Sequence, residues 1–328
     1  MALAFTAMMA AGLAVVPPNP STAQASRAIP TVYEAGHFYA VPDAVNGQKL
    51  RLLVDTGGGG GGGMYWITAE AAKRLGLSTR SCKLGESLLT VADLPNFKVG
   101  RGLPPPMSSS CGKALMIQSV PYQGGDGQLG AGYMPGRVWT FDYPAHQLLL
   151  RRPSWQPDSG VHAAKLGLAN GFARITIQVA GEPIQMLVDT GATSHPTPAG
   201  EKASHTPTVG GYGVTSYIDQ SVFARWHQAH PTWRVVPKGD DLYGPKLIEV
   251  PKVVVASWAV GPVWFTVQSR IAAYMSQYTD VPIQGALGGN VFRHFVMTVD
   301  YPHSAAYFQC ASDCKPASHQ RLSKAKSK

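Results

Sequence analysis

Two short segments of the sequence could carry acid–base chemistry. Residues 52–58 read LLVDTGG and residues 186–192 read MLVDTGA, so each places an aspartate directly after an apolar run and before Thr-Gly. The apolar run predicts a buried strand that ends at the aspartate. Glycine then permits a tight turn and the close approach of another backbone. Each aspartate is therefore expected to be desolvated and to need hydrogen-bond donors.

The two aspartates, Asp55 and Asp189, become a carboxyl pair if the two turns pack about a pseudo-twofold axis. Like charges at short range do not ionise together easily, so the pair would share one proton. The ionised carboxyl can act as a general base on a water molecule while the protonated one polarises a carbonyl. Such a pair hydrolyses an amide without a covalent intermediate, and it needs no cofactor and no metal.

The similarity between the two halves extends well beyond these turns. A hairpin signal precedes each one, at Asn46-Gly47 and at residues 180–182. Downstream, residues 125–150 match residues 282–308: both carry G-x-L-G, a spacer with an arginine, and a strand that ends in Asp-Tyr-Pro. The common order indicates duplication of a domain-sized unit. We expect an N-terminal lobe over residues 26–155 and a C-terminal lobe over residues 156–312.

The composition favours β structure over helix. The chain has 328 residues, 45% of them hydrophobic and 14% charged, which is enough to bury real cores. Valine, threonine, tyrosine and tryptophan recur in short runs between turn residues, and long helical patterns are scarce. This pattern is typical of a mainly β protein.

The paired V-D-T-G segments resemble a known family. Each is followed in its own half by GQLG (residues 127–130) or GALG (residues 285–288), and this arrangement resembles the aspartic peptidases of the pepsin and retropepsin clan. By motif content, the chain is most similar to bacterial secreted aspartyl protease-like proteins, which carry two lobes in one chain. The resemblance covers residues 29–308. It implies an all-β acid-protease fold with two homologous lobes and a central cleft.

The resemblance also implies roles for three pairs of residues. They are Asp55 and Asp189 as the catalytic pair, Thr56 and Thr190 as hydroxyls that bond to the opposite lobe, and Gly57 and Gly191 as turn glycines.

One departure concerns the residue after each D-T-G, which is Gly58 in the first half and Ala192 in the second. Many pepsin-like enzymes have a hydroxyl there that bonds the ionised aspartate, and a bond to the charged form lowers a pKa. Without it we expect the pair to titrate higher, with activity at mildly acidic to near-neutral pH. Thr193 and Ser194 could partly substitute in the second half.

A second departure concerns the flap, the hairpin that covers the site in pepsin-like enzymes. Residues 75–99 contain no convincing equivalent. The segment GGYGVTSYID (residues 210–219) has a suitable composition but lies in the second half. Two interpretations stay open, a changed flap or an ordinary loop.

The glycine run over residues 57–63 begins inside the first motif. Its first glycine belongs to the turn, so the run is not an interdomain linker. We expect the remaining glycines to form a mobile wall of the cleft. A phosphate-binding loop is excluded because Met64, rather than Lys-Ser or Lys-Thr, follows the run.

The leading hypothesis is a monomeric aspartic endopeptidase that acts on a peptide or protein substrate. One alternative is a catalytically inactive peptide- or envelope-binding protein that keeps the duplicated scaffold. Another is a self-processing regulator with a single natural target.

The first 25 residues indicate a cleaved signal peptide. The apolar run of residues 2–16 is too short to form a stable membrane span, and Ala23-Gln24-Ala25 offers a cleavage site. No basic residue precedes the run, which leaves a buried N-terminal helix as the alternative. We expect a secreted or periplasmic protein.

The net charge of +9 is concentrated at the C-terminus. Five basic and no acidic residues fall within residues 315–328, which leaves 23 basic and 19 acidic residues in the body. We expect residues 313–328 to form a basic disordered tail. No nucleic-acid motif is present, and the ten histidines lack a metal-binding spacing such as H-E-x-x-H.

The four cysteines allow two disulfides in three possible connectivities. Pairing of neighbours, Cys82 with Cys111 and Cys310 with Cys314, is the simplest pattern. Free thiols are the alternative.

Overall fold

Strands dominate the chain, as the short β-branched and aromatic runs predict. The computed structural model describes residues 26–317, apart from residues 60, 108 and 120–123. Strands make up 43% and helices 11% of the structure. The expected signal peptide, residues 1–25, lies outside the described residues.

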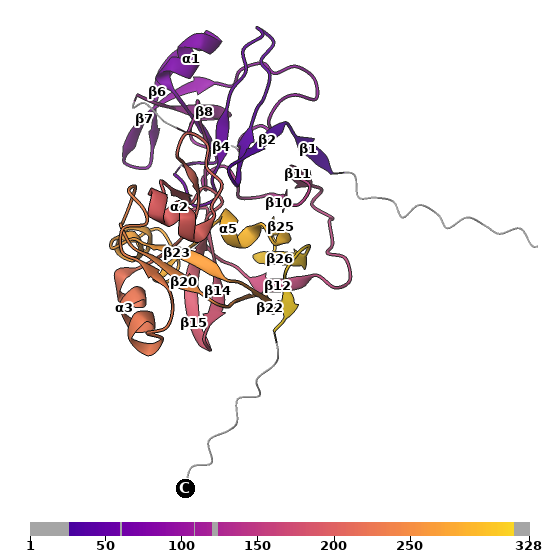
Figure 1. Ribbon diagram of the computed structural model, residues 1–328. Coiled ribbons are helices and arrows are strands. Elements are labelled where there is room, and N and C mark those ends of the chain that lie inside the picture. Colours follow the sequence, from indigo (N-terminus) through magenta and orange to yellow (C-terminus); the bar gives the residue numbers. More distant parts are fainter. Residues whose placement is uncertain (1–25, 60, 108, 120–123, 318–328) are drawn as a thin grey trace, which may run out of the picture.

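An eight-stranded sheet builds the first lobe (Figure 1). In spatial order its strands are β2 (Thr31–Glu34), β3 (His37–Ala40), β4 (Leu52–Val54), β9 (Gly127–Leu129), β5 (Trp66–Thr68), β8 (Ala114–Gln118), β7 (Ser87–Asp93) and β6 (Thr79–Leu84). Helix α1 (Ala69–Leu75) follows β5 directly.

An eleven-stranded sheet builds the second lobe. In spatial order its strands are β19 (Val235–Val236), β20 (Leu247–Val250), β23 (Val263–Val267), β18 (Ser216–Ile218), β24 (Gly285–Leu287), β15 (Glu182–Val188), β14 (Phe172–Val179), β21 (Val253–Val255), β22 (Trp258–Val260) and β27 (Lys315–Pro316), with β13 (Gly167–Ala169) beside β14. The other elements of this lobe are the two-stranded ribbon of β16 (Thr193–Ser194) and β17 (Gly213–Val214), and the helices α2 (Pro198–Ser204), α3 (Gln220–Ala229), α4 (Ile271–Met275) and α5 (Gly289–Phe292).

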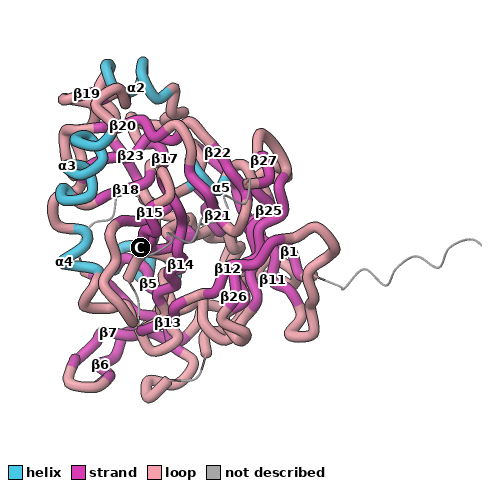
Figure 2. Tube along the Cα trace, turned by 90° about the horizontal axis from the view of Figure 1, so that it is seen from below, coloured by secondary structure: helices cyan, strands magenta, loops and turns pink. Residues whose placement is uncertain are grey.

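A six-stranded sheet joins the two lobes. Its order is β1 (Arg27–Ile29), β11 (Gln147–Arg151), β10 (Val138–Asp142), β25 (Phe295–Asp300), β26 (Ala305–Cys310) and β12 (His162–Lys165). The two D-Y-P strands, β10 and β25, pair at its centre, with Phe141 opposite Met297. Figure 1 shows β10 beside β25, and Figure 2 shows β1, β11, β12, β25 and β26 of this sheet together on one side of the molecule. The buried side chains of β10 and β25 belong to one hydrophobic core that continues from the first lobe into the second.

The two lobes repeat one strand pattern. In each, the strand that ends in the aspartate pairs in parallel with the strand of the G-x-L-G motif, as β4 with β9 and β15 with β24. That second strand then pairs antiparallel with β5 or β18, and a helix follows. The repeat confirms the predicted all-β acid-protease fold with two similar lobes.

The helix after each repeated strand begins at a residue suited to that position. Thr68 accepts a hydrogen bond from the amide of Ala71 at the start of α1, and Asp219 accepts one from Ser221 at the start of α3. Such caps satisfy amide groups that have no partner within the helix. α1 ends at Gly76 in the left-handed conformation (φ 72°), which glycine adopts without steric cost.

The C-terminal segment is ordered further than the sequence predicts. Lys315–Pro316 form β27, which pairs with β22 on the edge of the second-lobe sheet. The predicted start of the disordered tail at residue 313 is therefore wrong. Strand pairing uses main-chain groups, so the basic side chains of this segment did not indicate that it forms a strand. Residues 318–328 lie outside the described residues.

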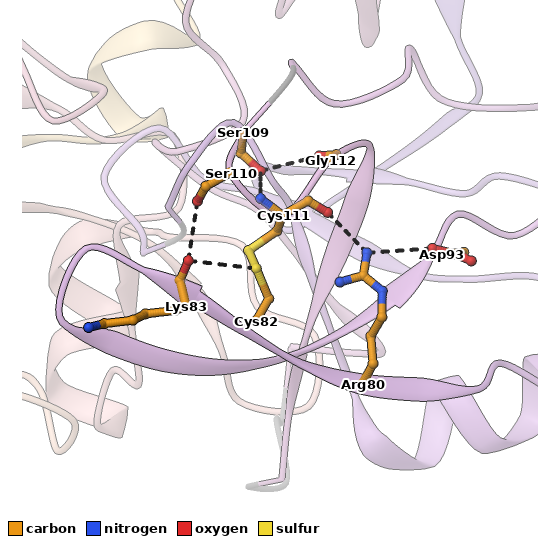
Figure 3. Close-up of a disulfide and its surroundings, with 8 residues drawn as sticks. All are labelled: Arg80, Cys82, Lys83, Asp93, Ser109, Ser110, Cys111 and Gly112. Atoms are coloured by element: carbon orange, nitrogen blue, oxygen red, sulfur yellow. Dashed lines mark hydrogen bonds and ion pairs between the residues drawn. A yellow bond between two sulfur atoms is a disulfide. The ribbon is translucent and has the colours of Figure 1, made fainter.

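Both disulfides pair neighbouring cysteines. Cys82 of β6 is bonded to Cys111, which precedes β8, and Cys310 is bonded to Cys314. The first bond fastens the β6–β7 hairpin to the segment before β8 (Figure 3). Arg80 reinforces this link, because its guanidinium donates to the Cys111 carbonyl (3.0 Å) and lies 3.7 Å from Asp93.

The two disulfides should differ in their effect on stability because they close loops of different length. Replacing Cys82 and Cys111 together by serine opens a loop whose ends are 29 residues apart in the sequence. The ends of the loop closed by the second disulfide are only 4 residues apart. We expect the first double variant to lose about 3–4 kcal/mol of unfolding free energy and the second clearly less. Urea unfolding of both double variants checks this, and equal losses would contradict it.

Candidate active site

The two aspartates lie at the ends of equivalent buried strands. Asp55 follows β4 and Asp189 follows β15, and each is only 8% exposed. The amide of Asp55 donates to the carbonyl of Leu129 (3.0 Å), and that of Asp189 donates to Leu287 (2.9 Å). The G-x-L-G strands thus extend alongside the aspartate turns and fix the backbone at the point where each aspartate leaves its strand.

Reciprocal threonine bonds fasten the two turns to each other. The Thr56 hydroxyl donates to the carbonyl of Val188 (2.6 Å) and accepts from the amide of Thr190 (3.1 Å). The Thr190 hydroxyl donates to Val54 (2.7 Å) and accepts from the amide of Thr56 (3.1 Å). Both threonines are at most 1% exposed. Each lobe therefore satisfies buried backbone groups of the other, as the sequence predicted.

The carboxyl groups of Asp55 and Asp189 lie close enough to influence each other's ionisation. Each also accepts a bond from the turn glycine of its own lobe, from Gly57 at 2.9 Å and from Gly191 at 3.1 Å. A Cβ atom on either glycine would lie within 3.0 Å of the opposite carboxyl. Glycine at these positions is what allows the two acids to approach, so the structure brings together all six residues singled out from the sequence.

Burial raises the pKa of both acids. For Asp55, the bond from Asp189 and the amide groups of Gly57 and Gly58 oppose the rise. For Asp189, the negative charge of Asp55 adds to the burial, and its pKa lies well above the usual value. The pair therefore holds one proton over a wide pH range.

The last glycine of each G-x-L-G motif lies against the backbone of another segment. In the first lobe that segment directly follows the aspartate turn, and in the second lobe it precedes β18. A Cβ atom on Gly130 would overlap the carbonyl of Gly59, and one on Gly288 would overlap the carbonyl of Thr215. The amide of Ala131 donates to Gly58 (2.9 Å) in the first lobe. These contacts give a physical reason for the glycine at the end of the motif.

The missing hydroxyl at residue 58 is replaced by a side chain from another strand. Gln128, the variable residue of the first G-x-L-G, donates from Nε2 to Oδ2 of Asp55. Its Oε1 accepts a hydrogen bond from the indole Nε1 of Trp66 at 3.0 Å. Gly58 and Ala192 supply no hydroxyl, but Asp55 receives a side-chain bond from elsewhere in its own lobe. In the second half, Thr193 does not substitute for the missing hydroxyl, because its own hydroxyl donates to the carbonyl of Gly191 (2.7 Å) instead.

His37 of β3 joins the first lobe to the second beside the carboxyl pair. Its Nε2 lies 3.1 Å from the Thr193 hydroxyl, whose own hydrogen is donated to Gly191. Nε2 must therefore carry a hydrogen and act as the donor. Burial lowers the pKa of His37 to about 4, with smaller opposing effects from the bonds to Ala192 and Gly191. The ring is thus neutral at mildly acidic and neutral pH.

A cleft of about 830 Å³ opens above the carboxyl pair and is lined by both lobes. Its lining includes the apolar side chains Leu53, Leu187, Val209 and Met275 and the tyrosines Tyr39, Tyr212, Tyr217, Tyr243 and Tyr274. Glu34, Arg51 and Arg270 contribute charged groups to the lining. Arg51 is bonded to Glu34 and lies 3.5 Å above the ring of Tyr39.

Two connections of the second lobe contribute to the wall of the cleft. Val209, Gly210 and Tyr212 come from the long β16–β17 connection, and Leu242 and Tyr243 come from the β19–β20 loop. In the first lobe, no described residue of the β6–β7 hairpin lines the cleft. The sequence left open whether residues 210–219 form a changed flap or an ordinary loop. Gly210, Tyr212 and Tyr217 of this segment line the cleft.

The glycine run packs within the first lobe rather than along the cleft. Of its described residues, only Gly57 lines the cleft, which corrects the expectation of a glycine wall. Gly62 and Gly63 adopt left-handed φ values of 58° and 80° that favour glycine. The greater mobility expected of this segment stays a prediction.

Two further acids, Asp142 and Asp300, close turns. Each ends one of the two central strands, β10 or β25, and accepts a backbone bond from the residue three positions on, Ala145 (3.0 Å) or His303 (3.1 Å). Within the described residues, no group of three or more His, Cys, Asp or Glu side chains could hold a metal ion. The described helices are too short or too polar to cross a membrane.

Comparison with solved structures finds matches over most of the chain. An aspartic proteinase from Irpex lacteus is 13% identical, with a TM-score of 0.49, covering 88% of this chain and 98% of its own. Basic 7S globulin from soybean is 11% identical, with a TM-score of 0.44, covering 88% and 95%. Both TM-scores lie below 0.5. No protein-family model and no curated protein sequence matches the chain.

Sequence reasoning missed three contributors to the site, Gln128, His37 and Tyr243. Gln128 carried a usable signal: it is a polar residue inside an apolar motif whose second copy has alanine. The other two lie in segments without a repeated pattern. Their placement depends on loop paths that periodicity does not reveal.

Loss of one threonine hydroxyl should destabilise the fold strongly. Thr190→Val leaves the carbonyl of Val54 and the amide of Thr56 buried without their partner. We expect a loss of about 2–4 kcal/mol in unfolding free energy, measured by urea denaturation. Thr176→Val is the control, because Thr176 is exposed and its hydroxyl bonds to the side chain of Gln185 rather than to a buried backbone group. Equal effects of the two variants would contradict this role.

Replacing Asp189 should flatten the pH dependence of stability. Its folded-state pKa lies above the unfolded value, so the folded protein binds more protons between the two. Stability from this group is fully present below about pH 4 and is lost as the pH rises through the folded pKa. In Asp189→Asn we expect a shallower fall in unfolding free energy above about pH 4. Urea titrations over that range test this, and parallel curves for the two proteins would refute it.

Proposed function

We propose that this chain is an aspartic peptidase that hydrolyses peptide bonds with a water molecule activated between Asp55 and Asp189. One observation supports this most directly: two buried carboxyl groups lie side by side, close enough to interact, in a cleft lined by both lobes. Reciprocal threonine bonds hold that pair in place. A buried acid pair has little structural advantage, because burial opposes its ionisation.

The proposed reaction uses one ionised and one protonated carboxyl. The ionised carboxyl removes a proton from water, whose oxygen attacks the peptide carbonyl carbon. The protonated carboxyl gives its proton to the developing oxyanion, so a neutral tetrahedral intermediate forms. The carboxyl that took the proton from water then gives it to the amide nitrogen as the C–N bond breaks, while the other carboxylate takes a proton from one hydroxyl of the intermediate. Products leave as a carboxylic acid and an amine, and the pair again holds one proton.

The cleft supports a peptide or protein as the substrate class. Its volume of about 830 Å³ lies within the range of ligand sites in proteins. Apolar and tyrosine side chains dominate its walls, which suits side chains of a bound peptide, while the acid pair lies at the floor. The second-lobe segments with Tyr212 and Tyr243 would lie against such a peptide.

The protein is further proposed to act as a monomer outside the cytoplasm. Support for this location comes from the signal-peptide pattern of residues 1–25 and from two disulfides, which persist in oxidising compartments. A direct check is whether the mature protein from the native host begins near residue 26.

Cleavage of a mixed peptide pool tests the function. We expect Asp55→Asn and Asp189→Asn each to lower kcat/KM at least about 100-fold, because each removes one partner of the acid–base pair. Since burial raises both pKa values, the acidic limb should lie above the ordinary carboxyl value of about 3.9. Asp142→Asn is the matched control, since this acid only closes a turn.

Three outcomes would contradict the proposal or redirect it. Retained cleavage in Asp55→Asn would exclude the acid pair. A profile that peaks well below about pH 3.5 would contradict the raised pKa values. Peptide binding without cleavage would favour the inactive binding protein, and cleavage of a single partner alone would favour a self-processing regulator. Inhibition by pepstatin is less decisive than these variants, because a changed flap would weaken the binding of pepstatin to an active enzyme.

A further inference from the structure

The two halves of the carboxyl pair are not chemically equivalent. Asp55 accepts a side-chain hydrogen bond from Gln128. The residue in the same place on the second lobe is Ala286, whose methyl group donates nothing. Both strands are otherwise paired in the same way with their aspartate strand. The only side-chain amide at the pair therefore belongs, among the described residues, to the first lobe.

The direction of the Gln128 amide is fixed by its second partner. Trp66 and Gln128 are opposite each other in the antiparallel pairing of β5 with β9. An indole N–H can only donate, so the carbonyl oxygen of the amide must face Trp66 Nε1, at 3.0 Å. The amide NH₂ then faces Asp55. The Gln128 side chain is only 6% exposed, so water competes little for these bonds.

Gly58 supplies the room for this amide. A Cβ atom at residue 58 would lie within 3.0 Å of both Gln128 Nε2 and Asp55 Oδ2. Gly58 is not among the glycines with a left-handed φ. The need for space, rather than for an unusual backbone conformation, therefore explains glycine at residue 58. Gly58 leaves the volume that the Gln128 amide occupies beside Asp55.

We propose that Gln128, oriented by Trp66, is a positioning residue that holds Asp55 in the ionised form and so assigns the base role to Asp55 and the proton to Asp189. The inference deepens the proposed peptidase function and depends on it for its consequence in catalysis. Its physical basis is that a hydrogen bond donated to a carboxylate favours the charged form. A carboxyl with an additional fixed donor therefore loses its proton first.

Other titratable and charged groups face the pair from the surrounding elements. They are His37 of β3, Tyr143 after β10, Tyr217 of β18, Tyr243 of the β19–β20 loop and the cleft residues Glu34, Arg51 and Arg270. Asp240 interacts with Tyr217 and Tyr243. Burial raises the pKa of the three tyrosines, which stay neutral throughout the range of interest. Burial also raises the pKa of Asp240, so the test must resolve individual acids.

Carbon-13 NMR of the aspartate carboxyl carbons in the full-length protein gives that resolution. Spectra of Asp55→Asn, Asp189→Asn and Asp240→Asn assign the three signals. In the wild type we expect Asp55 to titrate at the lower pH. In Gln128→Leu, which keeps the bulk but removes the donor, the lower apparent pKa of the pair should rise by about one unit. The acidic limb of kcat/KM should move by the same amount.

Matched variants separate positioning from simple structural damage. Gln284→Leu makes the same change just before the equivalent strand, where the side chain accepts a bond from Gln185, and should leave the pair unchanged. Trp66→Phe should shift the titration in the same direction by a smaller amount. Gln128→Glu replaces Gln128→Leu if the latter fails to fold, and its carboxylate should also raise the Asp55 pKa.

The outcomes distinguish this inference from the proposed function. An unchanged titration in Gln128→Leu, or a wild type in which Asp189 ionises first, overturns the inference even if peptides are cleaved. A shift of about one unit in a protein that cleaves no peptide supports the inference about the pair and overturns the function instead. Equal shifts in Gln128→Leu and Gln284→Leu would mean a general effect of destabilisation and would also refute it.

Discussion

The reciprocal bonds of Thr56 and Thr190 are the constraint on which the rest of the structure depends. Two carboxyl groups that are buried together oppose their own ionisation and gain little from proximity. They stay together because the strands that carry them cannot separate without leaving buried backbone groups of both lobes unpaired. The six-stranded sheet adds a second connection, where strands from the two halves share one core. The cleft follows from this geometry, since the lobes are joined at their base and diverge above it.

The lobes have kept a common framework and diverged in what it carries. The first lobe passes from Gly57 to β5 through a short glycine-rich connection, whereas the second inserts β16, α2 and β17 between Gly191 and β18. The insertion brings Val209 and Tyr212 to the cleft. A duplicated scaffold thus presents an asymmetric surface to a ligand, because this insertion lines the cleft in the second lobe only.

The fold and the acid pair were predictable because their signals are local and occur twice. An apolar run, an acid, a threonine and a glycine specify a strand and a turn without reference to the rest of the chain. Pairing the two copies needs only the assumption of symmetry. Gln128 and Trp66 could not be paired in this way, because they meet only once β5 lies beside β9. His37 depends similarly on the approach of the second lobe to β3. The strand at Lys315–Pro316 uses backbone groups alone, so its composition indicated disorder instead.

The contact between Gly58 and Gln128 has an implication for how such a site can change over time. A side chain at residue 58 and a long amide at residue 128 compete for one volume beside Asp55. Each can supply a donor, but not both together. One arrangement has glycine at residue 58 and glutamine at residue 128, and the other has a donor side chain at residue 58 and a smaller residue at 128. A change from one to the other by single substitutions passes through a protein in which the two side chains overlap or in which Asp55 has no side-chain donor. The two positions should therefore evolve as a coupled pair, and a single substitution moved between relatives would be harmful in a background where its partner is absent.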